Sequence, residues 1–307
     1  MIEVPPGSAG SADPKGRIRL GPTVAGTWYN DEPGALARQI DGFLKAGREK
    51  VPPCGRVRAL LVPHAGFTYS GAVAGAGFAW LRDQRFEHVV LLGPSHHARF
   101  PGAAAPSADV YCTPLGEVAL ASPAIASLDG QPGFRIHDAP FLPEHCLEAE
   151  ILFLQRALSP GWSLLPLLIG SGSTARDVAS VADGLRPWIT PDTLIVVSSD
   201  FTHFGPRFRY VPFQDGLPQR IEQLDMGAVE RILAGDAPGF ADYVERTGAT
   251  ICGRDAIGIL LQLLPGDLDS RLAAYDTSGR MTGDWNHTVS YASLVFCEPP
   301  RRSSGHE

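Results

Sequence analysis

The stretch TLIVVSSDFTHFG (residues 193–205) decides the fold. It begins with β-branched and aliphatic residues, a pattern typical of a strand that is buried on both faces. Polar side chains follow at once, among them Asp200 and His203. In an open α/β sheet the carboxyl ends of the parallel strands share one edge, and ligands bind along that edge. We therefore expect functional residues wherever a strand of this chain ends.

Two more apolar runs end in histidine. RALLVPHAG (58–66) carries His64, and HVVLLGPSHH (88–97) carries His96 and His97. Side chains of an extended chain alternate in direction, so the two adjacent histidines cannot both face one point. We expect His96 or His97 to be a ligand and the other to orient it or to contact substrate. A structural role, such as a bond to a loop carbonyl for His64, is the alternative.

Cys252 lies in TICGRDAIGILLQLL (250–264), just before a predicted helix. A helix N-terminus and the neighbouring Arg254 both lower the pKa of a thiol, which favours a thiolate. The alternative is a small buried hydrophobe, the commonest role of a free cysteine. Imidazole, carboxylate and thiolate together form a ligand set for transition metals. The pattern indicates a metal or redox pocket.

The residues after each strand have further interpretations. Asp200 and His203, three positions apart, are expected on one side of a turn or first helical turn, where Asp200 could also cap a helix. His203 suits a general acid/base because a histidine titrates near neutral pH. His145 begins a predicted helix and is within reach of the same crevice, while the acidic residues of that first turn suit the helix dipole. Trp28 and Tyr29 either wall the pocket or pack in the core.

Strands and helices alternate along the chain. This order predicts a three-layer α/β/α sandwich with a mostly parallel, mixed central sheet. We expect strands over 57–63, 88–92, 163–169, 193–198 and 288–296, and helices over 32–45, 71–81, 144–158, 174–188, 224–234, 239–245 and 255–264.

The 307 residues are expected to form one α/β domain over 18–298. Residues 1–17 and 299–307 are rich in proline, glycine and serine or strongly polar, and we expect them to be disordered. Region 100–143 is rich in loops, and 109–117 is expected to form an edge hairpin that would make the sheet mixed.

Composition and charge exclude several classes of protein. The net charge of -7 and the lack of a basic block argue against nucleic-acid and membrane-surface proteins. The N-terminus has no apolar core of a signal peptide, and no apolar run is suited to span a membrane. Five cysteines without a CxxC pair suggest a reducing compartment. We expect a soluble cytoplasmic protein.

Motifs of the common hydrolases and nucleotide-binding proteins do not occur. The sequence contains no HExxH of zinc proteases and no GxSxG elbow of serine hydrolases. It also contains neither GxGxxG nor the lysine motif of a P-loop, so nucleotide binding has no support. The pocket is therefore defined by residues that are far apart in the chain.

These segments, taken in order, resemble the MEMO family, whose prokaryotic members are called AmmeMemoRadiSam system protein B. The resemblance covers nearly the whole chain. Asn30, where a proline is usual, and Phe67, where a tyrosine is common, are small departures. The segments that carry it are AGTWYN (25–30), PHAGFTYSG (63–71), LLGPSHH (91–97), EHCLE (144–148), PLLIG (166–170), VVSSDFTHFGPRFRY (196–210), ICGRDAIG (251–258), YDTSG (275–279) and VSYA (289–292).

The family is similar in fold to the class III (LigB-type) extradiol dioxygenases. The resemblance implies that His64 and His96 occupy the positions of the two iron-ligating histidines and that His203 corresponds to the acid/base histidine. Asp200 is implied to lie beside the metal pocket. Cys252 stands where the dioxygenases use a glutamate. A thiolate is softer than a carboxylate, which favours copper, iron or zinc and argues against ring cleavage.

Two functions are compatible with this pattern. The first is a metal-dependent, dioxygenase-like oxidoreductase that holds iron (Fe²⁺) or copper, with zinc as an alternative, and acts on an unidentified small molecule. The family name implies AMMECR1-type and radical-SAM proteins as partners. The second is a non-catalytic module that binds a metal or a partner through a vestigial pocket. Hydrolysis by Cys252 with His203 is a third, less favoured interpretation.

Overall fold

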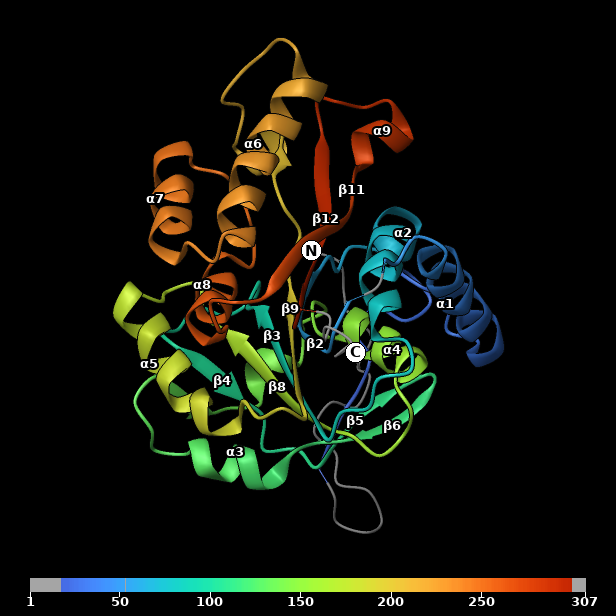
Figure 1. Cartoon of the computed structure of the whole chain (residues 1–307), viewed down its shortest axis with the longest axis vertical. Helices are drawn as coiled ribbons and strands as arrows, with labels where there is room; N and C mark the ends of the chain where they lie inside the picture. Colours follow the sequence, from blue (N-terminus) through green and yellow to red (C-terminus); the bar gives the residue numbers. More distant parts are fainter. Residues whose placement is uncertain (1–17, 53, 300–307) are drawn as a thin grey trace, which may run out of the picture.

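A mixed central sheet forms the middle layer of the computed structural model, which describes residues 18–52 and 54–299 (Figure 1). Its strands are β2 (Val57–Val62), β3 (His88–Pro94), β4 (Ala103–Ala105), β7 (Phe134–Ile136), β8 (Ser163–Ile169), β9 (Thr193–Ser198), β10 (His203–Phe204), β11 (Asp269–Thr277) and β12 (Thr288–Cys297). Their order across the sheet is β10-β12-β2-β9-β3-β8-β4-β7, and β11 also pairs with β12.

The four central strands β2, β9, β3 and β8 are parallel. Antiparallel pairing begins on both sides of them, where β12 joins β2 and β4 joins β8. Helices cover both faces of this sheet (Figure 1). The predicted fold class, a sandwich around a mostly parallel mixed sheet, is confirmed.

Helices pack on the sheet in two groups. One side has α1, α2 and α4, which contact one another, and the other has α5, α7 and α8, with α6 against α7 (Figure 1). The α-helices are α1 (Pro33–Arg48), α2 (Phe67–Phe78), α3 (Ser122–Leu128), α4 (Glu148–Ala157), α5 (Ala175–Leu185), α6 (Leu217–Leu233), α7 (Ala237–Thr247), α8 (Arg254–Leu263) and α9 (Ser278–Thr282). Among the described residues, no helix is both long and apolar enough to cross a bilayer.

Short 3₁₀ turns extend or connect these elements. They are η1 (Ala79–Leu81), η2 (Ala139–Phe141), η3 (Arg186–Trp188) and η4 (Pro206–Phe208). Two of them follow α2 and α5 directly, so the predicted helices over 71–81 and 174–188 each end in a 3₁₀ turn. Tightening of the last turn in this way is common at helix ends.

The hairpin expected over 109–117 forms, but in a different place from the one predicted. Its strands β5 (Val110–Thr113) and β6 (Gly116–Ala119) join β1 (Arg19–Leu20) in a separate three-stranded sheet. The expectation of a hairpin at the edge of the central sheet was therefore wrong. Region 100–143 does supply an antiparallel strand to the central sheet, but it is β4, and β12 makes the sheet mixed on the other side of the parallel strands.

Other differences concern the limits of elements. The helix predicted from residue 144 begins only at Glu148, so His145 lies in the turn before it. Strand β11 was not predicted, because eight of its nine residues are half-buried and its sequence DSRLAAYDT contains no long apolar run. The expectations for residues 1–17 and 300–307 fall outside the described residues.

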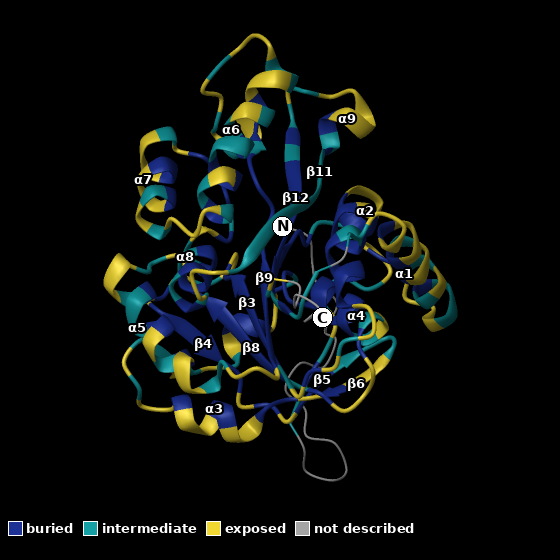
Figure 2. Ribbon diagram, viewed as in Figure 1, coloured by how far each residue is buried: buried dark blue, intermediate teal, exposed yellow. Residues whose placement is uncertain are grey.

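Small residues allow α1 and α2 to approach closely. The sequence of α2, FTYSGAVAGAGF, alternates glycine and alanine toward its end. A Cβ atom added at Gly75 would lie 2.6 Å from the Cβ atom of Phe43 in α1 and 2.9 Å from its carbonyl carbon. Real Cβ atoms do not approach backbone this closely, so Gly75 is required by the packing. This contact fixes the distance between α1 and α2, and eight of the twelve residues of α2 are buried (Figure 2).

We expect Gly75→Ala to destabilise the protein by about 1–3 kcal/mol, because the added methyl group overpacks the contact between α1 and α2. Gly42→Ala is the matched control, since it lies in the exposed part of α1 with nothing within 4 Å of the added Cβ. It should stabilise the helix by about 0.5–1 kcal/mol. Denaturant unfolding of both variants tests this, and equal stabilities would contradict it.

Candidate metal centre

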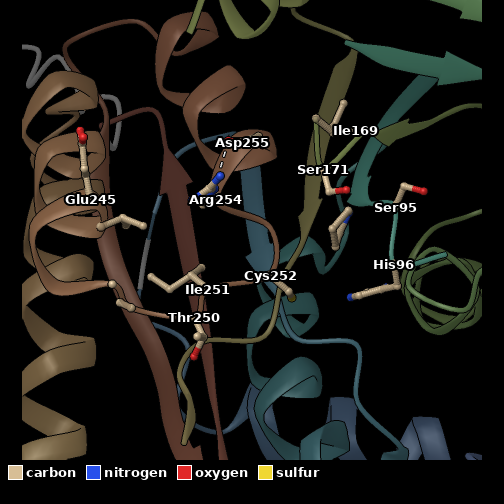
Figure 3. Close-up of a pocket in the computed structure, with 14 residues that line it drawn as sticks. Ser95, His96, Ile169, Ser171, Glu245, Thr250, Ile251, Cys252, Arg254 and Asp255 are labelled. Atoms are coloured by element: carbon tan, nitrogen blue, oxygen red, sulfur yellow. Dashed lines mark ion pairs between the residues drawn. The ribbon is translucent and has the colours of Figure 1, made fainter. Parts of the chain in front are cut away.

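Three potential metal ligands meet at the carboxyl edge of the sheet. His64 follows β2, His96 follows β3, and Cys252 lies just before α8. Their ligand atoms all lie within 4.8 Å of one another. In Figure 3, His96 and Cys252 face each other across the opening of a pocket. The structure thus brings together the three residues that the sequence predicted as ligands.

His64 is almost fully buried and held at its backbone. Its N–H donates to the Asp200 carboxylate at 3.0 Å, which ties the end of β2 to the end of β9. Its ring Nε2 lies 3.6 Å from the Sγ atom of Cys252. The position of Asp200 makes it a support for His64 as well as a neighbour of the pocket.

His96 is oriented by the buried carboxylate of Glu144. Glu144 accepts hydrogen bonds from the Nδ1–H of His96 at 2.8 Å and from its backbone N–H at 2.7 Å. Burial would raise the pKa of Glu144, but these bonds and the charge of His96 lower it to about 2. An ionised carboxylate on Nδ1 leaves Nε2 of His96 to face Cys252, which is how proteins commonly orient metal-binding histidines. Burial lowers the pKa of His96, but its contacts with Cys252 and Glu144 raise it to about 10, so the ring is charged until a metal displaces the proton of Nε2.

Cys252 lies in surroundings that favour a thiolate. Its Sγ atom accepts a hydrogen bond from the backbone N–H of Asp200 at 3.2 Å. Burial raises the thiol pKa, but His64, followed by His96, outweighs this and lowers the pKa to about 7. From the sequence we expected Arg254 and the helix N-terminus to lower the pKa of the Cys252 thiol, whereas the two histidines are the main cause. Arg254 instead pairs with Asp255 at 3.5 Å.

Asp200 and His203 do not begin a helix. The chain leaves β9 as an irregular segment and His203 enters the short strand β10, so neither a first helical turn nor the alternative role of Asp200 as a helix cap is found there. The Nδ1 atom of His203 lies 3.0 Å from the carbonyl oxygen of Thr250. A carbonyl can only accept, so Nδ1 carries the proton and Nε2 is free. The backbone N–H of His203 also donates to Oγ1 of Thr250 at 2.8 Å.

His145 and Trp28 form an aromatic wall beside the cluster. The His145 ring stacks on His96 with centroids 4.8 Å apart, and Trp28 contacts it edge-on at 4.4 Å. Burial, together with the charge of His64, lowers the pKa of His145 to about 3, so this ring is neutral. His97 is exposed and lies at the rim, 6.1 Å from the His145 ring.

Tyr29, the neighbour of Trp28, packs in the core. Its ring lies 5.5 Å from that of Phe67, and its hydroxyl donates to the buried carboxylate of Glu148. Glu148 also accepts from the backbone N–H of Thr23 at 2.6 Å. Tyr29 therefore anchors the segment that presents Trp28 rather than walling the cluster itself.

A cavity of about 640 Å³ opens beside the three ligands (Figure 3). His96, Cys252 and Arg254 line it, together with Thr250 and Ile251. The cavity provides room for a small molecule next to the cluster.

Three buried polar residues of the site were not predicted as site residues. Glu144 was interpreted only as an acidic residue of a helical first turn, and Glu150 was not singled out. Ser198, at the end of β9, contacts Nδ1 of His64 through its hydroxyl at 2.8 Å. These residues come next to the predicted ligands only in the folded chain. In the sequence, the one sign of this was that Glu144 directly precedes the candidate residue His145.

The family model described as "Memo: Memo-like protein" matches residues 21–295. The chain belongs to the Memo-like family. The protein memo-1 homolog of Caenorhabditis elegans is 32% identical over 90% of this chain and 82% of its own length. MEMO1 of Danio rerio is 30% identical over 88% of this chain and 94% of its own length. MEMO1 of Homo sapiens is 30% identical over 78% and 82%, respectively.

A solved structure supports the fold of this Memo-like protein. The uncharacterized protein JW3007 of Escherichia coli K12 aligns with a TM-score of 0.50 at 15% sequence identity. The alignment covers 78% of this chain and 99% of that one. At this identity the likeness concerns the fold alone.

In metal-free protein we expect Cys252 to be alkylated with a midpoint near pH 7, since its thiol pKa is lowered to about 7. His64→Gln should move this midpoint upward toward the ordinary 9.0, because His64 is the main group that lowers the pKa. The rate of iodoacetamide labelling at each cysteine, followed by peptide mass spectrometry across pH, measures both midpoints. An unchanged midpoint in the variant would contradict the assignment, and labelling of Cys112 is the internal control.

Proposed function

We propose that this Memo-like protein binds a single transition-metal ion through His64, His96 and Cys252 and uses it in redox chemistry. The observation that carries the proposal is the convergence of two imidazole nitrogens and one sulfur within 4.8 Å. Ligands from three separate segments of the chain meet here beside a cavity. An arrangement that only stabilised the fold would not require this set of donors.

The donor atoms can reach the protonation states that metal coordination requires. Glu144 accepts a hydrogen bond from the Nδ1–H of His96, which leaves Nε2 of that ring to face the other ligands. The thiol pKa of about 7 makes a thiolate accessible at neutral pH, which metal coordination requires. The residues present therefore fit the metal that the family implies.

The chemistry of the donors favours particular metals. A thiolate with two imidazoles suits copper, iron or zinc, and suits magnesium or calcium poorly. Iron or copper would supply one-electron chemistry at the site, and zinc would supply Lewis acidity only. A second group, His96, Glu144 and His145, also lies within 4.8 Å. Its carboxylate is already engaged by backbone N–H groups of His96, His145 and Cys146, so we favour the first group.

His203 supports an enzymatic role. Its Nδ1–H is fixed by the Thr250 carbonyl, which leaves Nε2 with a lone pair that can accept a proton. Thr250 also lines the cavity that holds His96 and Cys252, which brings His203 close to that cavity. We propose His203 as the general acid/base for a small-molecule substrate, with AMMECR1-type and radical-SAM proteins as partners in the same pathway.

We expect about one iron or copper ion per chain in anaerobically purified protein. The metal should be lost in Cys252→Ser and in His64→Ala, because each removes one ligand. His137→Ala is the matched control, since His137 is exposed and lies outside the cluster. Elemental mass spectrometry measures the metal content. A wild-type protein that stays metal-free after anaerobic reconstitution would contradict the proposal.

Glu144→Gln should weaken metal affinity by about 10- to 100-fold, because the amide no longer fixes the His96 ring as a carboxylate does. Competition with a chelator of known affinity measures the change. Affinity equal to wild type would mean that Glu144 serves only the fold.

His203→Ala distinguishes an enzyme from a metal-binding module. If the protein is an enzyme, this variant should keep its metal and lose about 10²–10⁴-fold of metal-dependent oxygen or reductant consumption. If the variant and the wild type consume oxygen and reductant equally, the non-catalytic binding module is favoured instead.

A further inference from the structure

A buried hydroxyl lies behind His64 and contacts three groups. Oγ of Ser198 lies 2.8 Å from Nδ1 of His64, 2.7 Å from the carbonyl oxygen of Cys146 and 2.9 Å from Oε1 of Glu150. Ser198 and Glu150 are completely buried, and His64 is almost completely buried. These contacts must therefore be satisfied among the four groups themselves.

The protons of this cluster can be assigned by counting donors and acceptors. A serine hydroxyl offers one proton and two lone pairs. The Cys146 carbonyl can only accept, so the proton of Ser198 goes to it. The two remaining neighbours must then donate to the lone pairs of Ser198. His64 does so through Nδ1–H, and Glu150 does so as a neutral carboxylic acid.

The surroundings of Glu150 independently indicate that its carboxyl group is neutral. Its second oxygen, Oε2, is buried and has no hydrogen-bond partner among the described residues. An ionised carboxylate would leave a charged oxygen without a donor in the interior, whereas a neutral acid leaves only a carbonyl oxygen there. Burial raises the pKa of Glu150 well above its ordinary value, and the nearby charge of Asp200 acts in the same direction.

We propose that Glu150 is a neutral acid whose proton secures Ser198 as the acceptor of the Nδ1–H of His64, so that Nε2 is the ring nitrogen that faces Cys252. Ser198 and Glu150 are positioning residues, since neither contacts the proposed metal position directly. The consequence for metal binding rests on the proposed function. The assignment of protons does not, because it concerns the metal-free protein.

The first test is NMR of metal-free protein that contains ¹⁵N-labelled histidine, with the His64 signals identified by their loss in His64→Gln. We expect a proton on Nδ1 of His64, whether or not Nε2 opposite Cys252 is protonated as well. A His64 ring protonated at Nε2 alone would overturn the proposal. The measurement needs no metal, so failure of the metal proposal and failure of this one are distinguishable.

Variants test the two positioning residues. Ser198→Ala removes the acceptor, and the His64 signals should shift to a mixture of tautomers. Glu150→Gln keeps a donor, its side-chain amide, and should leave the tautomer unchanged. The matched control is Ser163→Ala, which removes a histidine–serine contact of the same length, 2.8 Å to Nδ1 of His88, at the other end of β3. Unchanged His64 signals in Ser198→Ala, or a lost tautomer in Glu150→Gln, would overturn the proposal.

Stability as a function of pH tests the neutral acid and does not require Ser198→Ala to fold. A carboxyl whose folded pKa is raised stabilises the fold fully below its unfolded pKa, and this contribution is lost as the pH rises toward the folded pKa. Glu150→Gln lacks this titration. Its free energy of unfolding relative to wild type should therefore increase from about pH 5 to about pH 8, above the ordinary value of 4.5. A flat difference across this range would show an ionised Glu150 and overturn the proposal.

Discussion

The parallel pairing of β2, β9 and β3 is the constraint on which the site depends. Leu61 of β2 lies opposite Val197 of β9, which lies opposite Leu92 of β3. Because these strands end at one level, the residues that follow them are forced into the same crevice. His64 and His96 meet there although they are far apart in the chain. The sheet register, rather than any long loop, sets the distance between them.

Two buried carboxyl groups of one short segment differ in protonation: Glu144 is ionised, and Glu150 is neutral in our proposal. Glu144 receives N–H donors from His96, His145 and Cys146 and is ionised. Within the described part of the chain, the side chain of Glu150 has only the hydroxyl of Ser198 as a hydrogen-bond partner, and its interior position favours the neutral acid. Glu144 accepts a hydrogen bond from Nδ1–H of His96 directly, whereas Glu150 acts on Nδ1–H of His64 through the hydroxyl of Ser198. The number of available donors decides which state each group adopts.

The sequence predicted the central strands and the meeting of His64, His96 and Cys252, because apolar runs and the geometry of parallel sheets are local or general features. It could not predict how Glu144 acts, since an acidic residue near a helix start already has a sufficient local explanation. The alternative of a capping role for Asp200 failed for a related reason. The chain turns into β10 instead of a helix, and the carboxylate binds the backbone of His64. Strand β11 was missed because its half-buried residues do not form an apolar run.

Most residues of the segment 144–150 contact the ligands of the site or the residues that position them. It reaches the histidine after β3, the tryptophan of the N-terminal segment, and the serine at the end of β9. These contacts come from both side chains and a backbone carbonyl, at fixed spacing. Adding or deleting a single residue here would break several of them at once. The length of this segment is therefore under tighter constraint than the identity of any one of its residues, and natural insertions should be found on either side of it rather than within it.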